Sequence, residues 1–178
     1  YAVAKASAFW LVNNYRESYD NLFICCGILF NHESPLRKIN FVTQKIITTA
    51  YRIANGSDEI LELGRLDISR DWGWAPEYVE AMWLMLQQSK PNDFVCSTGI
   101  SHTVKDLVEY VFGKLELDWK KYIKQDKKFY RSEELQYLKG DCSKAKTELN
   151  WKHEYTFETM LDEMITYWKN YYTKQENK

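Results

Sequence analysis

The sequence predicts an α/β protein with a parallel sheet. Two short apolar runs, at residues 22–30 and 93–97, have the length and continuity of strands buried on both faces of a sheet. Each run ends in polar or glycine-containing residues and is followed by a stretch with helical periodicity. Strands that alternate with helices in this way are typical of a parallel sheet.

The remaining elements follow from local pattern. The first helix is predicted at residues 1–19, which begin Ala-rich and carry Phe9 and Trp10. The other expected elements, in order, are a polar loop at 31–35, a helix at 41–55, a short strand at 59–63, a loop at 65–74, a helix at 76–88, a helix ending near 117, an irregular segment at 118–128, a strand or loop at 129–135, a short helix at 141–149 and a last helix at 156–171.

Two of these expectations bear on function and on the core. The polar loop at 31–35 follows a strand, and ligands bind at the carboxyl ends of strands in open α/β sheets. Four residues of the helix at 76–88 are expected in the core rather than at a cofactor: Met82, Trp83, Met85 and Leu86.

Composition bounds the class of protein. The chain has 178 residues, of which 45% are hydrophobic and 28% charged, with a net charge of −1. This is ordinary for a globular domain, and it gives no reason to expect nucleic-acid or membrane-surface binding. The four cysteines and three histidines show no metal-ligand spacing, so no metal is expected. Free thiols inside apolar runs predict a reducing, cytoplasmic location.

The first five residues contain a candidate catalytic pair. Tyr1 and Lys5 lie four residues apart, which places the phenol and the ammonium on one face of a helix. A nearby cation favours the ionised form of a phenol, so such a tyrosine can accept a proton near neutral pH. The motif is weak by itself, because Tyr110 and Lys114 repeat it on what we interpret as an ordinary helix face.

The glycines, in contrast, give no indication of a cofactor-binding loop. The seven glycines contain no G-x-G or G-x-x-G pair, so the chain carries no phosphate-cradling loop of the Rossmann or P-loop type. If a dinucleotide binds, we expect the segment that holds its pyrophosphate to lie upstream of Tyr1. The 178 residues alone would then expose apolar surface and associate or dissolve poorly.

Taken together, the ordered motifs resemble the GDP-mannose 4,6-dehydratases, which are extended short-chain dehydrogenase/reductases acting on nucleotide sugars. The resemblance covers nearly the whole chain. Its motifs are Tyr1-x-x-x-Lys5, GILFNHESP from Gly27, NFVTQK from Asn40, RDWG from Arg70, EYVEAMWLMLQ from Glu77, DFV from Asp93, Tyr130-Arg131, LKGDCSKAK from Leu138 and LNWK from Leu149.

The resemblance implies a fold and a domain division. The chain would be the C-terminal part of a Rossmann-like sheet with a smaller mixed α/β substrate-binding part. Residues 1–37 and roughly 66–97 would end the dinucleotide-binding sheet. Residues 38–65 and roughly 98–178 would bind the sugar nucleotide. The glycine-rich N-terminal half is absent from the sequence.

The resemblance also implies an activity. The family dehydrates GDP-mannose to GDP-4-keto-6-deoxymannose, a step of deoxysugar nucleotide biosynthesis on the GDP-fucose pathway. NADP takes a hydride from C4 and returns it to C6, a tyrosinate takes the 4-hydroxyl proton, and a glutamate assists loss of the C6 hydroxyl. Tyr1 would be that tyrosine. The family's Thr or Ser and its Glu come from a segment before this motif and have no counterpart in the sequence.

Site residues carry over one at a time. Tyr1 and Lys5 would be the catalytic residues. The NADP contacts would be Tyr1, Lys5, His32 and Arg37. The expected sugar-nucleotide contacts are Asn31, Lys45, Arg70, Arg131 and Glu134. Converging cations suit a diphosphate, which arginine binds with a two-pronged fork. A homodimer or homotetramer that buries the first helix and its neighbour is implied as well.

Four departures from the family's pattern leave the sugar open. Trp74 and Pro76 stand in place of His and Lys, and Ser132 and Glu133 in place of Pro and Thr. We expect them to border the sugar-nucleotide pocket. The alternatives are therefore a dehydratase or epimerase of a related nucleotide sugar, such as a GDP-heptose, and a non-catalytic remnant that binds nucleotide sugar without turnover.

Overall fold

The computed structural model describes residues 1–130 and 133–176. The α-helices are α1 (Ala2–Ser18), α2 (Val42–Ala54), α3 (Ala75–Leu86), α4 (Val104–Lys114), α5 (Ser143–Glu148) and α6 (Phe157–Glu176). The strands are β1 (Cys26–Leu29), β2 (Asn31–Glu33), β3 (Leu61–Leu63), β4 (Ser69–Arg70), β5 (Trp72–Trp74), β6 (Asp93–Cys96), β7 (His102–Thr103) and β8 (Ile123–Gln125). Two 3₁₀ turns, η1 (Trp119–Lys121) and η2 (Lys127–Phe129), flank β8.

The strands form pairs, and most of the pairs are parallel. β1 pairs with β6, β2 with β5 and β3 with β8, all parallel, whereas β4 and β7 are antiparallel. In the parallel pair β1–β6, Cys26 lies opposite Asp93 and Leu29 opposite Cys96. These pairings confirm the prediction of an α/β protein with parallel strands.

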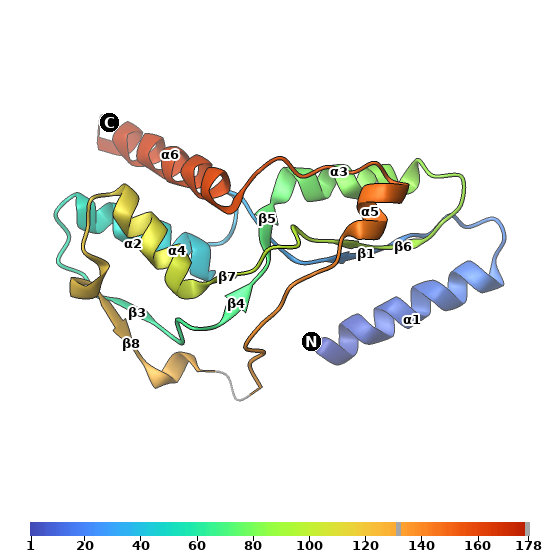
Figure 1. Ribbon diagram of the computed structural model, residues 1–178, viewed down its shortest axis with the longest axis horizontal. Helices are drawn as coiled ribbons and strands as arrows, with labels where there is room; N and C mark the ends of the chain where they lie inside the picture. The colour runs from blue at the N-terminus through green and yellow to red at the C-terminus, as the bar shows by residue number, and fades with distance from the viewer. Residues whose placement is uncertain (131–132, 177–178) are drawn as a thin grey trace.

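The elements fall into two groups (Figure 1). In one, α3 and α5 lie on one side of the β1–β6 pair and α1 lies on the other side. In the other, α2, α4 and α6 pack on each other beside β3 and β8. β2, β4, β5 and β7 lie where the chain passes between the two groups, which is also where the candidate site lies.

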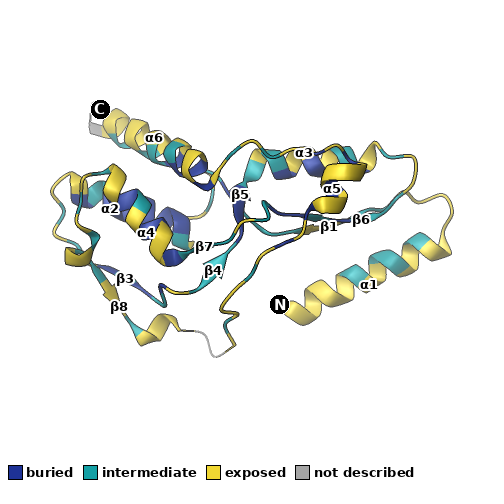
Figure 2. Ribbon diagram, viewed as in Figure 1, coloured by how far each residue is buried: buried dark blue, intermediate teal, exposed yellow. Residues whose placement is uncertain are grey.

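Each group has its own hydrophobic cluster. The larger one combines the inner faces of α2, α4 and α6 with β3, and Ile46, Leu107 and Leu161 are fully buried in it. The smaller one joins α3, β6 and α5 around Tyr78 and Trp151. Figure 2 shows these buried faces in dark blue. The domain boundaries expected from the sequence stay a prediction.

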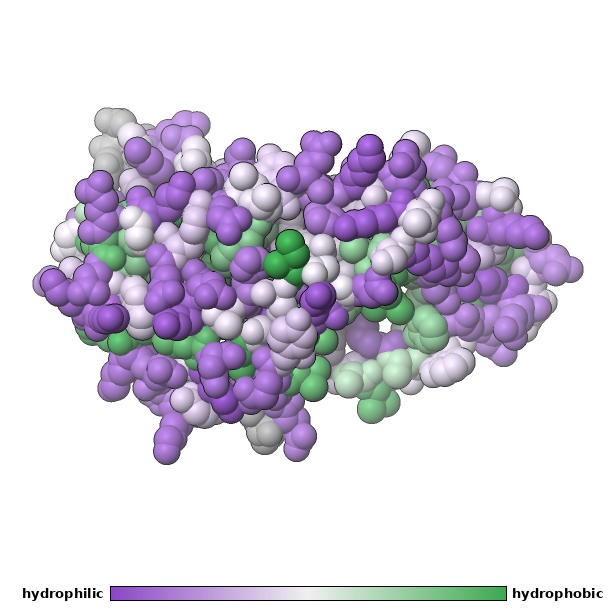
Figure 3. Space-filling view, in the orientation of Figure 1, coloured by the Kyte–Doolittle hydropathy of each residue, from purple (hydrophilic) through white to green (hydrophobic). Residues whose placement is uncertain are grey.

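Helix α1 contributes to neither cluster. None of its residues is buried, and its exposed apolar side chains include Val3, Trp10 and Leu11 (Figures 2 and 3). Its described ties to the sheet come from Arg16, whose Nε donates to the Ile24 carbonyl oxygen at 2.8 Å and whose terminal nitrogen pairs with Asp93. The hydrogen bond that Arg16 donates to Asp93 raises the pKa of the Arg16 guanidinium.

Strand β1 and helix α3 correct two expectations about burial. Ile28 is 45% exposed, so this strand is not covered on both faces in the described chain. Of the four α3 residues expected in the core, only Met85 is buried, because Met82, Trp83 and Leu86 face outward together with Val79. The spacing 79, 82, 83, 86 is one helical stripe. The prediction of a helix here is confirmed, whereas the prediction that Met82, Trp83 and Leu86 lie in the core is wrong.

Two segments expected to be loops contain strands instead. Asn31–Glu33 forms β2, paired in parallel with β5, and Ser69–Arg70 forms β4. Their side chains are polar, so no apolar run signalled them; the backbone groups are satisfied by a partner strand some 40 residues away. The irregular segment at 118–128 likewise contains β8, which pairs with β3.

Gly73 makes a close approach possible at the start of α3. A Cβ at this position would lie 2.4 Å from a ring carbon of Tyr78. That ring is fully buried between His32, stacked at 5.0 Å, and Trp151, edge-on at 5.7 Å, so it has no room to move. We expect Gly73→Ala to lower the free energy of unfolding by about 1–3 kcal/mol, measured by urea denaturation.

Gly113 offers the matched control for this substitution. It lies inside α4, and a Cβ there would meet nothing within 4 Å. Gly113→Ala should therefore stabilise the protein, by about 0.5–1 kcal/mol, because alanine favours the helix. Equal effects of the two substitutions would contradict the assignment of Gly73 as a contact point.

Residues 1–130 and 133–176 contain no helix with both the length and the apolar character needed to cross a bilayer. In the same residues, no three His, Cys, Asp or Glu side chains gather closely enough to hold a metal ion.

Candidate functional site

A cleft of about 550 Å³ opens between β2, the start of α2, the end of β3 and β4. It is lined by five of the residues that the sequence proposed for ligand binding: Asn31, Arg37, Lys45, Arg70 and Glu134. With Arg65, four cationic side chains line this cavity, together with the carboxylates of Glu33, Glu62 and Glu134. Arg131, the other arginine proposed for the sugar nucleotide, lies outside the described residues.

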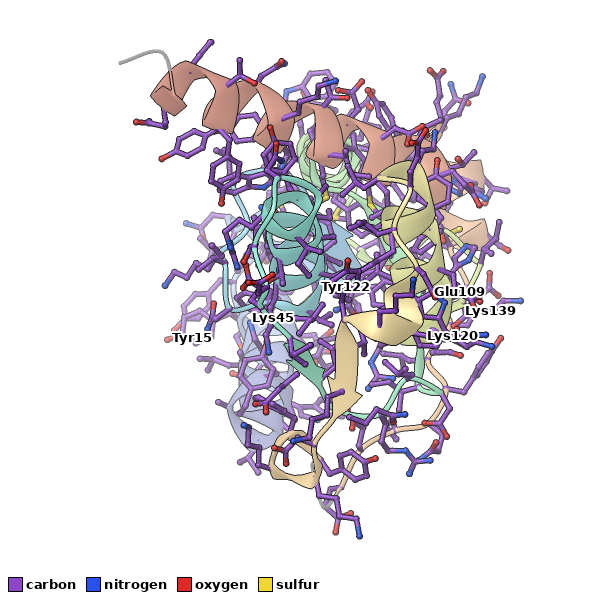
Figure 4. All side chains as sticks on the ribbon, turned by 90° about the vertical axis from the view of Figure 1, so that its left-hand side faces the viewer. Tyr15, Lys45, Glu109, Lys120, Tyr122 and Lys139 are labelled. Atoms are coloured by element: carbon purple, nitrogen blue, oxygen red, sulfur yellow. The ribbon has the colours of Figure 1, made fainter. Side chains whose placement is uncertain are left out.

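Lys45 reaches the cleft from α2. Its Nζ donates to the Glu62 carbonyl oxygen at 2.6 Å and lies 4.5 Å from the centre of the Phe129 ring. Burial lowers the pKa of Lys45; Glu62 opposes this shift and Lys128 adds to it. Figure 4 shows Lys45 on the opposite side of the molecule from Lys120 and Glu109. The ammonium has one strong protein partner and donors left for a ligand.

Arg70 is held at the floor of the cleft by carbonyl groups. Its Nη1 donates to the carbonyl oxygens of Ser69 and Leu135, each at 2.8 Å, and its Nη2 lies 3.6 Å from Glu134 Oε1. Glu134 is itself well covered. The two carbonyl groups fix the orientation of the guanidinium, while Glu134 offsets part of its charge.

Arg37 and Glu33 form the third part of the cleft wall. The Glu33 carboxylate is buried, accepts a hydrogen bond from Thr43 Oγ1 at 2.6 Å, and lies 3.4 Å from Arg37 Nε. The Arg37 guanidinium stacks 3.8 Å above the Phe41 ring. Burial raises the pKa of Glu33, while Thr43 and Arg37 oppose the rise.

His32 is held away from this cleft. Its ring stacks on Tyr78 and its Nδ1 lies 2.8 Å from the Phe30 carbonyl oxygen. A carbonyl oxygen only accepts, so Nδ1 is the donor of this hydrogen bond, and Nε2 makes no contact with the Phe30 carbonyl. Asn31 and Glu33, on either side of it in β2, line the cleft. The alternation of side chains along the strand accounts for this separation.

Tyr1 and Lys5 do not line the cleft. Tyr1 is 95% exposed, and Lys5 Nζ lies 5.5 Å from the centre of its ring, so the pair shares one helix face as expected. The N-terminal end of α1, which carries both residues, is directed toward the middle of the molecule (Figure 1). The structure thus presents a cationic cleft and an open Tyr–Lys pair at separate places.

With this geometry in view, comparison with known proteins decides the family. The family described as GDP-mannose 4,6 dehydratase matches residues 1–164. The chain belongs to this family.

Individual dehydratases show the same relation. The chain is 51% identical over 165 residues to GDP-mannose 4,6 dehydratase 1 of Arabidopsis thaliana, covering 93% of this chain and 45% of the relative. It is 46% identical to GDP-mannose 4,6 dehydratase of Homo sapiens, covering 93% and 49%, and 40% identical to that of Vibrio cholerae, covering 93% and 51%. The chain therefore spans about half the length of the dehydratases it matches.

Solved structures confirm the Rossmann-like, extended short-chain dehydrogenase/reductase fold. RMD from Pseudomonas aeruginosa, complexed with NADPH, superimposes with a TM-score of 0.86 at 22% identity, over 96% of this chain and 56% of that one. UDP-glucose 4-epimerase from Thermotoga maritima gives 0.83 at 20% identity, over 97% and 54%.

Two of the four departures from the family's pattern line a cavity of their own. Trp74 and Pro76 line a separate depression of about 480 Å³, where Trp74 stacks on Tyr155 at 5.0 Å. Neither borders the cationic cleft. Ser132 lies outside the described residues, and Glu133 is exposed. That these residues border the sugar-nucleotide pocket stays a prediction.

Asp71 is a residue whose structural role sequence reasoning missed. It is fully buried, although its neighbours Arg70 and Trp72 give no local sign of a buried charge. Its carboxylate accepts from Thr98 N, Thr98 Oγ1, Gly99 N and Gly140 N, at 2.7–3.2 Å. It thus ties β5 to two passing segments and fixes the backbone beside Arg70. No pattern near residue 71 announces donors 27 and 69 residues away.

Proposed function

We propose that the full-length protein carries out the NADP-dependent dehydration of GDP-mannose to GDP-4-keto-6-deoxymannose. The single observation that carries the proposal is the cleft, where Arg37, Lys45 and Arg70 converge with Asn31 and Glu134. Three fixed cations suit a nucleoside diphosphate, and a carboxylate and an amide suit hydroxyl groups. Its membership of the dehydratase family and its 40–51% identity to named dehydratases support the same substrate.

The residues present fit part of an NADP site. Tyr1 and Lys5 are free of hydrogen bonds from other described side chains and open to a ligand, and the hydrogen bond of His32 to the Phe30 carbonyl oxygen uses Nδ1 and not Nε2. The chain has no glycine-rich phosphate loop, so the rest of the cofactor site lies outside these residues. RMD, the structural neighbour complexed with NADPH, supports the choice of a nicotinamide cofactor.

When bound, NADP would supply the redox chemistry by accepting a hydride from C4 of the sugar and returning it, from the reduced cofactor, to C6. The chain's own residues would do the rest. The Tyr1 phenolate takes the proton of the 4-hydroxyl, and the Lys5 ammonium stabilises that phenolate and holds the ribose of the cofactor. Arg70 and Lys45 bind the diphosphate and fix the sugar beside Tyr1. The Thr or Ser and the Glu of the reaction belong to the part of the protein outside these residues.

We also infer a homodimer or homotetramer. α1 exposes Val3, Trp10 and Leu11, and α3 exposes an apolar stripe that includes Trp83. Apolar stripes of this size on helices are typical of interfaces between subunits. All four cysteines are free, which supports a cytoplasmic location. We infer no metal, nucleic-acid or membrane partner.

The deciding experiment is incubation of the full-length protein with NADP and GDP-mannose, followed by detection of a 4-keto product. Turnover of a GDP-heptose in place of GDP-mannose would favour the related-sugar alternative. Binding of GDP-mannose with no turnover of either sugar would favour a non-catalytic remnant.

Arg70 gives a residue-level test of the same proposal. We expect Arg70→Ala to raise KM for GDP-mannose by about 10- to 100-fold with little change in kcat, because a charged hydrogen bond contributes about 1.5–3 kcal/mol. Lys120→Ala is the control, since Lys120 does not line the cleft and its replacement should leave KM unchanged. An unaltered KM in the Arg70 variant would remove this residue from the binding site.

A further inference from the structure

The turn that carries Arg37 is held from α2 in an unusually complete way. Gln44 is fully buried, and its side-chain amide nitrogen lies within hydrogen-bond distance of three carbonyl oxygens: Ser34 at 3.0 Å, Pro35 at 2.7 Å and Arg37 at 3.1 Å. Its own oxygen accepts a hydrogen bond from Trp168 Nε1 of α6 at 2.7 Å. The backbone of residue 37 is therefore fixed through one glutamine.

The side chain of Arg37 is positioned by Thr43, the residue that precedes Gln44 on α2. Thr43 is fully buried, and its hydroxyl orients the Glu33 carboxylate, which in turn lies beside Arg37 Nε. The Phe41 ring lies under the guanidinium. Arg37 Nε is buried and makes no hydrogen bond of its own, so the carboxylate holds it by charge alone. This leaves the two terminal nitrogens to interact with a ligand.

A buried carboxylate in the wall of an anion-binding cleft calls for an explanation. Burying a charge is costly unless a counter-charge neutralises it, and an unpaired Glu33 would repel a phosphate. Arg37 neutralises it, and Glu33 restricts the arginine to one orientation. Pre-orientation removes part of the entropy that a flexible arginine loses on binding.

We propose that Thr43 and Gln44 are positioning residues for Arg37, and that with Glu33 they aim its guanidinium at a phosphate oxygen of a ligand in the cleft. The inference rests on the proposed function for its ligand class, a phosphate group. That phosphate belongs either to the sugar nucleotide, whose other contacts line the same cleft, or to the cofactor. Neither Thr43 nor Gln44 lines the cleft, so each acts through Arg37.

The test uses two substitutions of matched shape and unchanged charge, Thr43→Val and Gln44→Met, in the full-length protein. Binding of GDP and, separately, of NADP is measured by calorimetry, without turnover. We expect Gln44→Met to weaken binding of one of these ligands by about five- to tenfold and Thr43→Val by about threefold. Thr48→Val is the matched control: its hydroxyl is equally buried on α2 but bonds the Gln44 carbonyl oxygen, and binding should change less than twofold.

Repeating both substitutions in an Arg37→Ala background separates positioning from general damage. If Thr43 and Gln44 act through Arg37, neither changes affinity by more than twofold once Arg37 is gone. The same loss in both backgrounds, or no loss in either, overturns the proposal. Weaker GDP binding alone assigns the phosphate to the sugar nucleotide, and weaker NADP binding alone assigns it to the cofactor; either outcome supports the role of the two residues.

The two proposals fail separately. A protein that binds GDP and NADP but turns over no GDP-sugar contradicts the dehydratase activity and leaves the Arg37 assignment standing. A protein with normal turnover whose Thr43 and Gln44 variants bind both ligands normally contradicts only the latter.

Discussion

Replacement of Tyr1 by Phe in the full-length protein is expected to lower kcat by about 10²- to 10⁴-fold, the usual contribution of a positioned proton acceptor. The ring and its place on α1 are retained, and only the hydroxyl is lost. Binding of GDP-mannose should change little, because Tyr1 lies outside the cationic cleft. Steady-state kinetics and a binding titration on the same variant measure both quantities.

Tyr15→Phe is the matched control for this substitution. Tyr15 lies on the same helix, is also exposed, and makes a ring contact with Tyr19. Its hydroxyl has no role in the proposed chemistry, so kcat should be unchanged. Full activity of the Tyr1 variant would remove this tyrosine from the mechanism, and an equal loss in both variants would indicate damage to α1 instead.

Replacement of Asp71 by Ala should have the largest effect on stability. Four donors from Thr98, Gly99 and Gly140 converge on its buried carboxylate, and each would lose its acceptor. Unsatisfied buried donors cost about 1–3 kcal/mol each, so the variant should lose on the order of 4 kcal/mol or more. Thermal unfolding and urea denaturation of the full-length protein measure the loss.

A graded series makes this prediction specific. Thr98→Val removes one of the four donors to Asp71, together with the hydrogen bond that Ile100 N donates to the same hydroxyl, and it should destabilise by about 1–2 kcal/mol. Asp67→Ala removes an exposed partner of Arg65 and should leave the melting temperature unchanged. An Asp71 variant as stable as the Asp67 variant would show that the carboxylate is not needed to gather these segments.

Much of the fold was predictable because its elements carry local signals. Residues 41–55 have helical periodicity and form α2, Pro76 lies in the first turn of α3, and Thr103 caps α4 by a capping box with Asp106. Strand β2 was not predictable in this way. Its three residues are polar, and its pairing with β5 depends on the tertiary structure rather than on any neighbour in the chain.

The candidate site was likewise predictable only in part. Resemblance placed Asn31, Lys45 and Arg70 in a common site, and the structure brings them to one cleft. Their roles as ligand contacts stay predictions. The supports of the site, Asp71 and Gln44, escaped notice because a side chain's partners in distant segments leave no local trace in sequence. The exposure of the apolar stripe on α3 was not predictable either, because a stripe that faces solvent has the same sequence pattern as one that faces the core.

The contact between Trp168 and Gln44 joins positions 124 residues apart and connects the end of the chain to the cleft. A truncation or a tag that disturbs the C-terminal turns of α6 should therefore weaken ligand binding in the cleft from a distance. Protein prepared for assay should keep α6 intact, and replacement of the Trp168 indole should lower ligand affinity in the cleft.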